Sequence, residues 1–298
     1  MPTLFKNKWF LLSIMALTWG SSFILIKKSL LVFTPFQIGA FRVALSGLIL
    51  ASLGIPAMRK MSKRDLLWVI LAGFFGNFLP MFLFPIAQTK VSSSLAGIIN
   101  SLEPIFVLML GYLLFKIKSQ PTQVMGAVIG FLGAATLLYF SEVSTQESQI
   151  GFTLLMVFAS ASYALSALII KLKLQHVKSI QVSSSVFTFW MMPSIIILLF
   201  TDFFNVSFSS EALEALGYLS FLSIFGTAIG IVLFYKLIQD TSAVFASTVS
   251  YLLPIVAVIW GVIDGEQFNF YYLLGAVLIL IGIYLIREKK KKPIVTIR

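Results

Sequence analysis

The stretch SSSLAGIINSLEPIFVLMLG, residues Ser92 to Gly111, is a long apolar segment that contains a carboxylate at Glu103 and a proline at Pro104. A second stretch of the same kind, SAVFASTVSYLLPIVAVIWG, runs from Ser242 to Gly261 and has Pro254 at the position that corresponds to Pro104. The chain therefore contains an internal repeat, and such repeats determine the architecture of a protein.

The composition is that of a membrane protein. The chain has 298 residues, of which 59% are hydrophobic and 11% are charged, whereas an ordinary soluble domain is about 25% charged. It has no cysteine and one histidine, His176, so we expect no disulfide, no metal site and no cofactor. Its net charge of +11 is interpreted here as membrane topology and not as nucleic-acid binding.

Apolar segments long enough to cross about 30 Å of hydrocarbon need about 20 helical residues. Ten such segments are present, and each is expected to be a helix because lipid offers the backbone no hydrogen-bond partners. The predicted fold class is therefore an all-α integral membrane protein. The predicted spans are Trp9 to Ile26, Pro35 to Ile55, Leu66 to Ile86, Ser92 to Phe115, Pro121 to Phe140, Ile150 to Ile170, Ile180 to Thr201, Ala212 to Leu237, Ser242 to Ile263 and Phe270 to Ile286.

The distribution of lysine and arginine predicts the orientation. With a cytoplasmic N-terminus, nearly all of the 22 basic residues fall in cytoplasmic segments, and the exceptions are Lys27, Lys28, Lys90 and the intramembrane Arg42. The positive-inside rule then places both termini in the cytoplasm, in a cell (inner) membrane. An alternative is that the first span is a signal peptide, but no A-x-A cleavage pattern follows it.

Pairs of residues recur in order along the two halves. They include Trp19 with Tyr163, Lys27 with Lys171, Gln37 with Gln181, Gly76 with Gly226, Phe84 with Phe234, Pro104 with Pro254 and Gly111 with Gly261. Five helices in each copy force the second copy to enter the membrane from the opposite side, which makes this an inverted-topology repeat around a central cavity. The predicted units are residues 1–144, residues 145–288 and a basic cytoplasmic tail at residues 289–298.

Several motifs resemble those of the EamA-type carriers of the drug/metabolite transporter superfamily. They are ALTWGSSF at Ala16 to Phe23, FQIGAFRVAL at Phe36 to Leu45, the Pro and Gly of the fourth and ninth spans, and GVIDGEQFNFYYLLGAVLILIGIYL at Gly261 to Leu285. The resemblance covers both copies. It implies a ten-helix carrier of small metabolites, often amino acids moved outward, with a cavity built from helices one to four and six to nine.

The two copies differ in charge. Lys116 stands in the first copy where the second has Glu266, and Leu253 stands where the first has Glu103. A central site would therefore be asymmetric.

Glu103, Asn100 and Arg42 are the polar candidates for substrate binding. A carboxylate within a span costs at least about 2.5 kcal/mol and usually faces a cavity or a partner. Glu103 would bind a substrate ammonium group or take up a proton, with Asn100 on the same helical face. Arg42 would bind a carboxylate bidentately. The alternatives are a structural Glu103–Arg42 pair, a protonated Glu103, and an Arg42 that extends to the interface or bridges two helices.

Four further residues are candidates for hinges or gates: Pro104, Pro254, Pro80 and Gly230. Proline removes a backbone donor and can kink a helix near mid-membrane. Asn77, like Pro80 on the third span, is either a cavity residue or a packing residue. Glycines at Gly126, Gly130, Gly133, Gly275 and Gly282 predict close helix packing.

Aromatic residues could form the wall of a substrate pocket. The candidates are Trp19, Tyr163, Trp190, Tyr235 and Tyr251. We favour Trp19 and Tyr163 because they occupy corresponding positions in the repeat. Packing in the core or against lipid is the alternative for the others.

These features predict a secondary transporter that exports amino acids or related small metabolites by alternating access, as a monomer or homodimer. No nucleotide-binding P-loop is present in the sequence. The alternatives are an exporter of drugs or toxic organic compounds, a nucleotide-sugar-type carrier, a pore and a polytopic membrane enzyme. The sequence does not favour an enzyme because it lacks a cluster of Asp, Glu and His at one surface.

Overall fold

A computed structural model describes residues 7–91, 93–139, 150–206, 209–263 and 270–286, and every regular element in these ranges is helical. The helices of the first half are α1 (Lys8–Gly20), α2 (Ser22–Ser29), α3 (Pro35–Lys60), α4 (Lys63–Gly73), α5 (Leu79–Gln88), α6 (Ser93–Asn100), α7 (Glu103–Phe115) and α8 (Pro121–Tyr139). Those of the second half are α9 (Ile150–Lys173), α10 (Ser179–Leu199), α11 (Ser210–Phe221), α12 (Gly230–Asp240), α13 (Ala243–Ser247), α14 (Val249–Ile263) and α15 (Phe270–Ile286).

Local sequence signals determine where several helices begin. Thr34 and Gln37 form a reciprocal capping box at the start of α3, with Pro35 in the first turn. The Ser62 hydroxyl accepts a hydrogen bond from the backbone N–H of Asp65 at the start of α4. Such side-chain oxygens satisfy backbone donors that the first turn leaves without partners.

Within the described residues, many of these helices join end to end into segments that are long and apolar enough to cross a membrane. Seven segments satisfy this condition by length and composition: Lys8–Ser29, Pro35–Lys60, Lys63–Gln88, Ala96–Phe115, Ile150–Lys173, Ser179–Leu199 and Ser210–Asp240. Two shorter apolar stretches, Ala243–Val256 and Phe270–Ile286, accompany them. The all-helical, multi-pass membrane architecture is confirmed. The expected loop Asp264–Glu266 and the tail from Arg287 lie outside the described residues.

Three of the predicted spans are interrupted. The first span is interrupted at Ser21, the fourth between Asn100 and Glu103, and the ninth at Thr248. Pro104 lies in the first turn of α7, where proline replaces a donor that has no partner anyway. Pro254 lies inside α14, and the interruption of that span comes six residues before it.

Two π-helical segments occur within otherwise α-helical stretches. One, η2 (Phe74–Phe78), joins α4 to α5, and the other, η4 (Leu222–Ile229), joins α11 to α12. They include Gly76 and Gly226, which correspond to each other in the sequence repeat. π-Helical turns are rare and occur frequently at functional sites.

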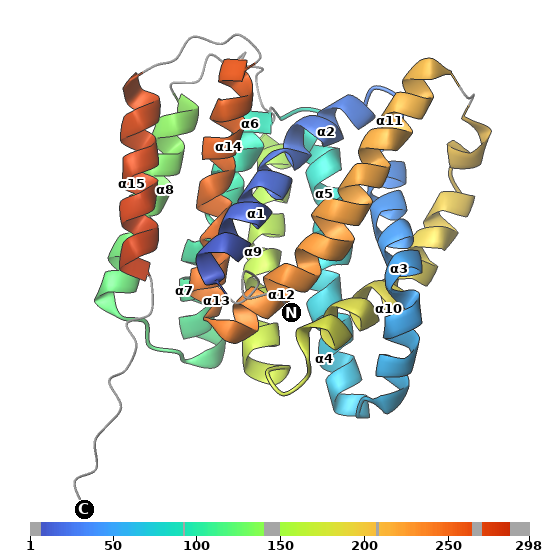
Figure 1. The fold of residues 1–298 in the computed structure, drawn as a ribbon, viewed down its shortest axis with the longest axis horizontal. Helices are drawn as coiled ribbons and strands as arrows, with labels where there is room; N and C mark the ends of the chain where they lie inside the picture. The colour runs from blue at the N-terminus through green and yellow to red at the C-terminus, as the bar shows by residue number, and fades with distance from the viewer. Residues whose placement is uncertain (1–6, 92, 140–149, 207–208, 264–269, 287–298) are drawn as a thin grey trace, which may run out of the picture.

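Two antiparallel helix pairs lie at opposite lateral sides of the bundle. They are α8 with α15 and α3 with α10 (Figure 1). Glycines permit the first of these contacts. A Cβ on Gly133 would lie 2.8 Å from the Gly275 carbonyl oxygen, and one on Gly126 would lie 2.7 Å from that of Gly282. The predicted small-residue packing face is therefore confirmed for this pair.

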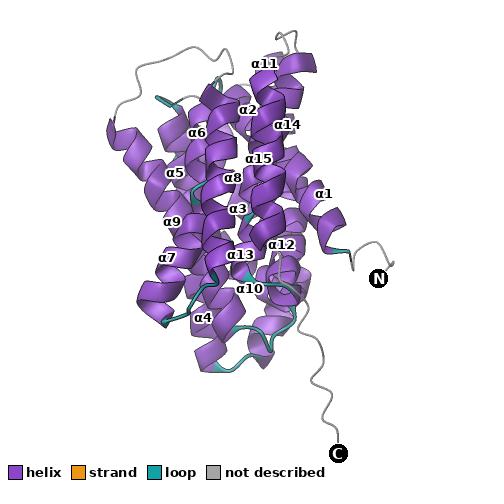
Figure 2. Ribbon diagram, turned by 90° about the vertical axis from the view of Figure 1, so that its left-hand side faces the viewer, coloured by secondary structure: helices purple, strands orange, loops and turns teal. Residues whose placement is uncertain are grey.

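The other helices fill the middle of the bundle between these pairs (Figures 1 and 2). Helix α1 packs against α12 and α14, while α9 packs against α5 and α7. We define the basic face as the end of the bundle at which α1 begins and α3, α7, α9 and α12 end. Its described basic residues include Lys8, Lys60, Lys63, Lys116, Lys173, Lys178 and Lys236.

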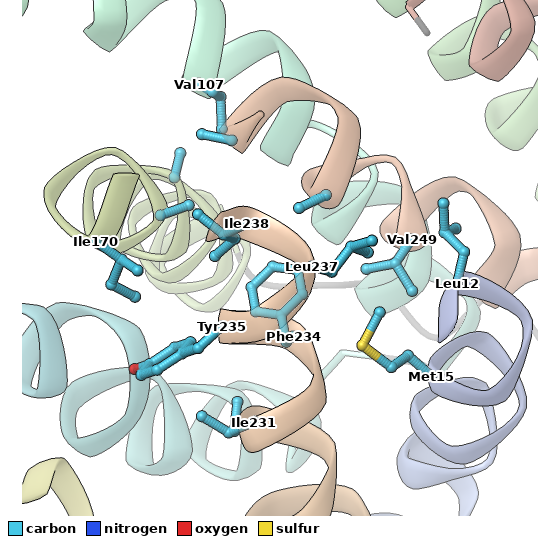
Figure 3. Close-up of a cluster of buried hydrophobic side chains, with 14 of the residues drawn as sticks. Leu12, Met15, Val107, Ile170, Ile231, Phe234, Tyr235, Leu237, Ile238 and Val249 are labelled. Atoms are coloured by element: carbon cyan, nitrogen blue, oxygen red, sulfur yellow. The ribbon is translucent and has the colours of Figure 1, made fainter. Parts of the chain in front are cut away.

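An apolar plug fills the centre of the bundle on the side of the basic face. It includes Leu12, Met15, Val107, Ile170, Leu237, Ile238 and Val249, each at most 1% exposed (Figure 3). Ile231, Phe234 and Tyr235 of α12 belong to the same cluster (Figure 3). Because these side chains come from both halves of the chain, the plug holds the halves together and closes the bundle at this level.

Candidate functional site

A central cavity lies among the mid-sections of helices from both halves. The cavity has a volume of about 90 Å³. This is room for several water molecules. Its wall comprises Trp19, Ser22, Phe23, Ile26, Arg42, Gly76, Met81, Phe84, Asn100, Glu103, Tyr163, Ser166, Gly226, Ile231, Phe234, Tyr235, Val249 and Leu253. None of these residues belongs to α8 or α15, so these two helices lie outside the site.

Corresponding residues of the two copies line the same cavity. The pairs are Trp19 with Tyr163, Ser22 with Ser166, Gly76 with Gly226, Met81 with Ile231, Phe84 with Phe234 and Glu103 with Leu253. The wall is thus built twice from matching positions. Only the last pair places an ionisable group opposite an apolar one.

Two aromatic pairs repeat this arrangement on opposite sides of the cavity. The Trp19 ring lies 5.0 Å from that of Phe234 in an edge-on contact. The Tyr163 ring lies 5.8 Å from that of Phe84 and is stacked on it. Each pair joins the first predicted span of one copy to the third predicted span of the other. Aromatic contacts of this kind stabilise by about 0.5–1.5 kcal/mol in addition to the contribution of the surface area that they bury.

Glu103 is the first residue of α7 and lines the cavity. It is 4% exposed, and its Oε1 atom has no hydrogen-bond partner among the described residues. Asn100 is 7% exposed, and its Oδ1 atom also lacks a partner there. Buried polar atoms are nearly always hydrogen-bonded, so those without a partner need an explanation such as water or a ligand.

Arg42 enters the cavity from α3 and is 8% exposed. Its Nη2 atom donates to the Thr227 hydroxyl at 3.2 Å, while its Nε atom has no partner in the described part of the chain. No ion pair within 4.0 Å joins Arg42 to Glu103, although both side chains are described. Tyr163 lines the same cavity as these two residues.

The π-helical segments form part of the cavity wall. The indole Nε1 of Trp19 donates to the Gly226 carbonyl oxygen at 2.6 Å, and the Ser166 hydroxyl donates to the Ala72 carbonyl oxygen at 2.8 Å. A Cβ on Gly76 would lie 2.1 Å from the Ser166 Oγ atom. Backbone carbonyls at or beside the π-helical segments thus accept hydrogen bonds from side chains of the cavity.

The structure brings together five of the predicted binding residues: Trp19, Arg42, Asn100, Glu103 and Tyr163 all line the cavity. Asn77 is one layer behind the wall, where its Nδ2 atom donates to the Tyr235 hydroxyl at 2.6 Å. Tyr251 lies elsewhere, since its hydroxyl donates to the Ala127 carbonyl oxygen of α8 at 2.6 Å.

The predicted hinge residues have different positions. Pro80 is the second residue of α5, after η2, and Gly230 is the first residue of α12, after η4. A Cβ on Gly230 would lie 2.9 Å from Trp19 Nε1. Pro104 and Pro254 both lie on the helices that bear Glu103 and Leu253. Trp190 donates instead to the Ile70 carbonyl oxygen, between α10 and α4.

Sequence reasoning did not identify Ser22, Met81, Ser166 and Ile231 as wall residues. Their signal was present in the repeat, because Ser22 corresponds to Ser166 at the offset that relates Trp19 to Tyr163. Met81 and Ile231 are related in the same way as Phe84 and Phe234.

A multi-pass helical membrane protein with a charged cavity among its spans has the features of a transporter, because buried ionisable groups in spans usually face a substrate pathway. Comparison with known families agrees with this class. The EamA-like transporter family matches residues 7–139 and again residues 151–287. The chain belongs to this family, and the resemblance found in the sequence is confirmed.

Relatives extend over nearly the whole chain. An uncharacterized transporter of Archaeoglobus fulgidus is 28% identical, over 95% of this chain and 100% of its own length. A probable amino-acid metabolite efflux pump of Salmonella typhimurium is 25% identical, over 93% of each chain. A solved structure matches with a TM-score of 0.72 at 15% identity, over 94% of this chain and 96% of that one, which supports the fold.

Proposed function

We propose that this protein is a secondary carrier that exports amino acids or related small metabolites through its central cavity. The observation that supports this most directly is the pair of unlike ionisable groups, Arg42 and Glu103, that line one cavity without pairing with each other. A zwitterion would supply a carboxylate for the guanidinium and an ammonium group for the carboxylate.

The same proposal includes ten spans in two inverted repeats. The double family match and the pairing of corresponding residues across the cavity support two structural copies. With five spans in each copy, one copy would be inverted relative to the other. Two such copies have two nearly equivalent arrangements, and alternating access needs this property.

We further propose that the basic face is cytoplasmic, which places both termini there in a cell (inner) membrane. Most of the described lysines lie at the basic face, which supports this orientation. The opposite face has few lysines, namely Lys27, Lys28 and Lys90. Positive residues in short loops are retained on the cytoplasmic side.

The small volume and mixed wall of the cavity favour a small substrate. Apolar side chains such as Phe23, Met81 and Phe234 surround the charged groups, as in pockets that fix a ligand by a few polar contacts within an apolar wall. A nucleotide sugar would need more cations than Arg42 for its phosphates. An exporter of apolar cations is the second candidate, because Glu103 and the two aromatic pairs would suffice for such a molecule.

The test is exchange by the purified protein in liposomes. Labelled amino acids inside the vesicles should leave faster when unlabelled amino acid is present outside, and the flux should saturate. Such trans-stimulation distinguishes a carrier from a pore. Flux equal to that of empty liposomes for every amino acid, together with saturable flux of an apolar cation, would favour the second candidate.

A further inference from the structure

On the basis of the proposed carrier function, we propose that Lys171 and Lys27 are gating residues that act alternately at the two faces of the membrane. In this assignment Lys171 closes the basic face in the present conformation. Lys27 makes the equivalent contact at the opposite face when the cavity opens toward the basic face.

A hydrogen-bonded junction lies one turn beyond the cavity on the side of the basic face. The Lys171 Nζ atom donates to the carbonyl oxygens of Gln239 at 3.0 Å and Thr241 at 2.5 Å. The Gln239 Nε2 atom donates in the opposite direction, to the carbonyl oxygens of Leu174 at 3.0 Å and Val177 at 2.8 Å.

This junction joins two helix C-termini. Helix α9 ends at Lys173 and α12 ends at Asp240, so both ends present carbonyl groups without helical partners. Each end also has the negative pole of a helix dipole, and two such poles repel each other. The Lys171 ammonium group offsets this repulsion, and the Gln239 amide satisfies carbonyls of the other helix.

The junction is linked directly to the cavity wall. Helix α9 bears Tyr163 and Ser166, and α12 bears Ile231, Phe234 and Tyr235, all of which line the cavity. Helix α13, which follows the turn after α12, is also held by α1, since the Trp9 ring lies 5.4 Å from that of Phe245. Opening the cavity toward the basic face would separate α9 from this turn, and the Lys171 contacts would break.

The first copy has a lysine at the corresponding position of the opposite face. Lys27 corresponds to Lys171, and Thr89 and Val91 correspond to Gln239 and Thr241. Lys27 lies near the C-terminus of α2, and α5 ends beside it at Gln88. Lys27 is exposed and makes no hydrogen bond or ion pair within the described residues. The lysine contact is therefore formed at the basic face and not at the opposite face, where the Gln88 Nε2 atom of α5 donates to the Phe23 carbonyl oxygen of α2 at 3.3 Å.

The proposal is tested by measuring distances across both faces with pairs of spin labels. The chain has no native cysteine, so each labelled pair is unambiguous. Leu31 and Lys90 are exposed at the opposite face, and Lys178 and Asp240 are exposed at the basic face. Each pair is replaced by cysteines and measured without substrate in liposomes, so the result does not depend on which molecule is transported.

Lys171→Met keeps the length of the side chain and removes the cation. It should increase the ratio of basic-face-open to basic-face-closed molecules by about tenfold, since hydrogen bonds to charged groups stabilise by that order. The Lys178–Asp240 distance should lengthen and the Leu31–Lys90 distance should shorten. Lys27→Met should shift the ratio in the opposite direction, and Lys171→Arg should resemble the wild type.

Lys173→Met and Lys28→Met are the matched controls. These neighbouring lysines lie over the rings of Trp68 and Tyr218 and not at a junction of helix ends, so they should leave the distances unchanged. If Lys171→Met does not fold, Gln239→Leu removes the complementary bonds and should give the same shift. Equal distances in the Met variants and the controls, or shifts of Lys171→Met and Lys27→Met in the same direction, would overturn the proposal.

Discussion

Replacing Glu103 by glutamine tests whether this carboxylate binds substrate or supports the fold. The side chain is 4% exposed, and its Oε1 atom has no partner in the described residues. Glutamine keeps the shape and removes the charge, whose burial costs several kcal/mol. The ligand-free Glu103→Gln protein should therefore unfold at a temperature equal to or above that of the wild type.

The same substitution should weaken the binding of substrate. A hydrogen bond to a charged group contributes about 1.5–3 kcal/mol, which corresponds to a roughly 10- to 150-fold increase in Kd for a substrate with an ammonium group. The assay is a thermal-shift titration of the solubilised protein with an amino acid, with its amine analogue that lacks the carboxylate and with its acid analogue that lacks the ammonium group.

Arg42→Gln is the matched variant, because Arg42 lies in the same cavity and has the opposite charge. Glu103→Gln should weaken the binding of the amino acid and of its amine analogue but not the binding of the acid analogue. Arg42→Gln should weaken the binding of the amino acid and of its acid analogue but not the binding of the amine analogue. If Glu103→Gln bound all three ligands as the wild type does, or unfolded several degrees lower, the carboxylate would be structural and the reasoning refuted.

Three further predictions concern packing and the cavity wall. Tyr251→Phe removes the hydrogen bond to the Ala127 carbonyl oxygen and should destabilise the protein by about 1–3 kcal/mol in a denaturation assay. The Kd for substrate should not change. A changed Kd would place Tyr251 in the site. Gly133→Leu should force α8 away from α15, where a Cβ would lie 2.8 Å from backbone atoms, and should cost about 1–3 kcal/mol. Its control is Gly151→Ala, which meets nothing within 4 Å and should be neutral in the same assay. Trp19→Phe removes the donor to the Gly226 carbonyl oxygen and should slow exchange in liposomes by about tenfold; wild-type exchange would show that this contact to η4 is dispensable.

Sequence reasoning predicts the helical membrane fold well because membrane-spanning helices leave a long apolar signal. It also identifies the helix that bears Glu103 and predicts Arg42, Asn100, Trp19 and Tyr163 as site residues. This is possible because the amino-acid sequence shows charge, polarity and internal repetition directly. The glycines of the α8–α15 contact, such as Gly133 and Gly275, are informative for the same reason.

The irregular parts of the helices are not predictable in this way. Nothing in FFGNF distinguishes a π-helical segment from an α-helix, because the choice depends on which side chains satisfy the released carbonyls. Pro254 suggested a kink, but the ninth span is interrupted at Thr248. Tyr251 and Tyr163 are both tyrosines within spans, and only the packing of α14 against α8 separates the structural one from the cavity residue.

The central claim is that a zwitterion occupies the cavity between Arg42 and Glu103. A structure determined with an exchanged amino acid bound tests it most directly. The ligand carboxylate should lie within hydrogen-bond distance of the Arg42 guanidinium group, and the ligand ammonium group should lie within the same distance of the Glu103 carboxylate. A ligand bound outside this cavity, or bound inside it with neither group in contact, would contradict the account.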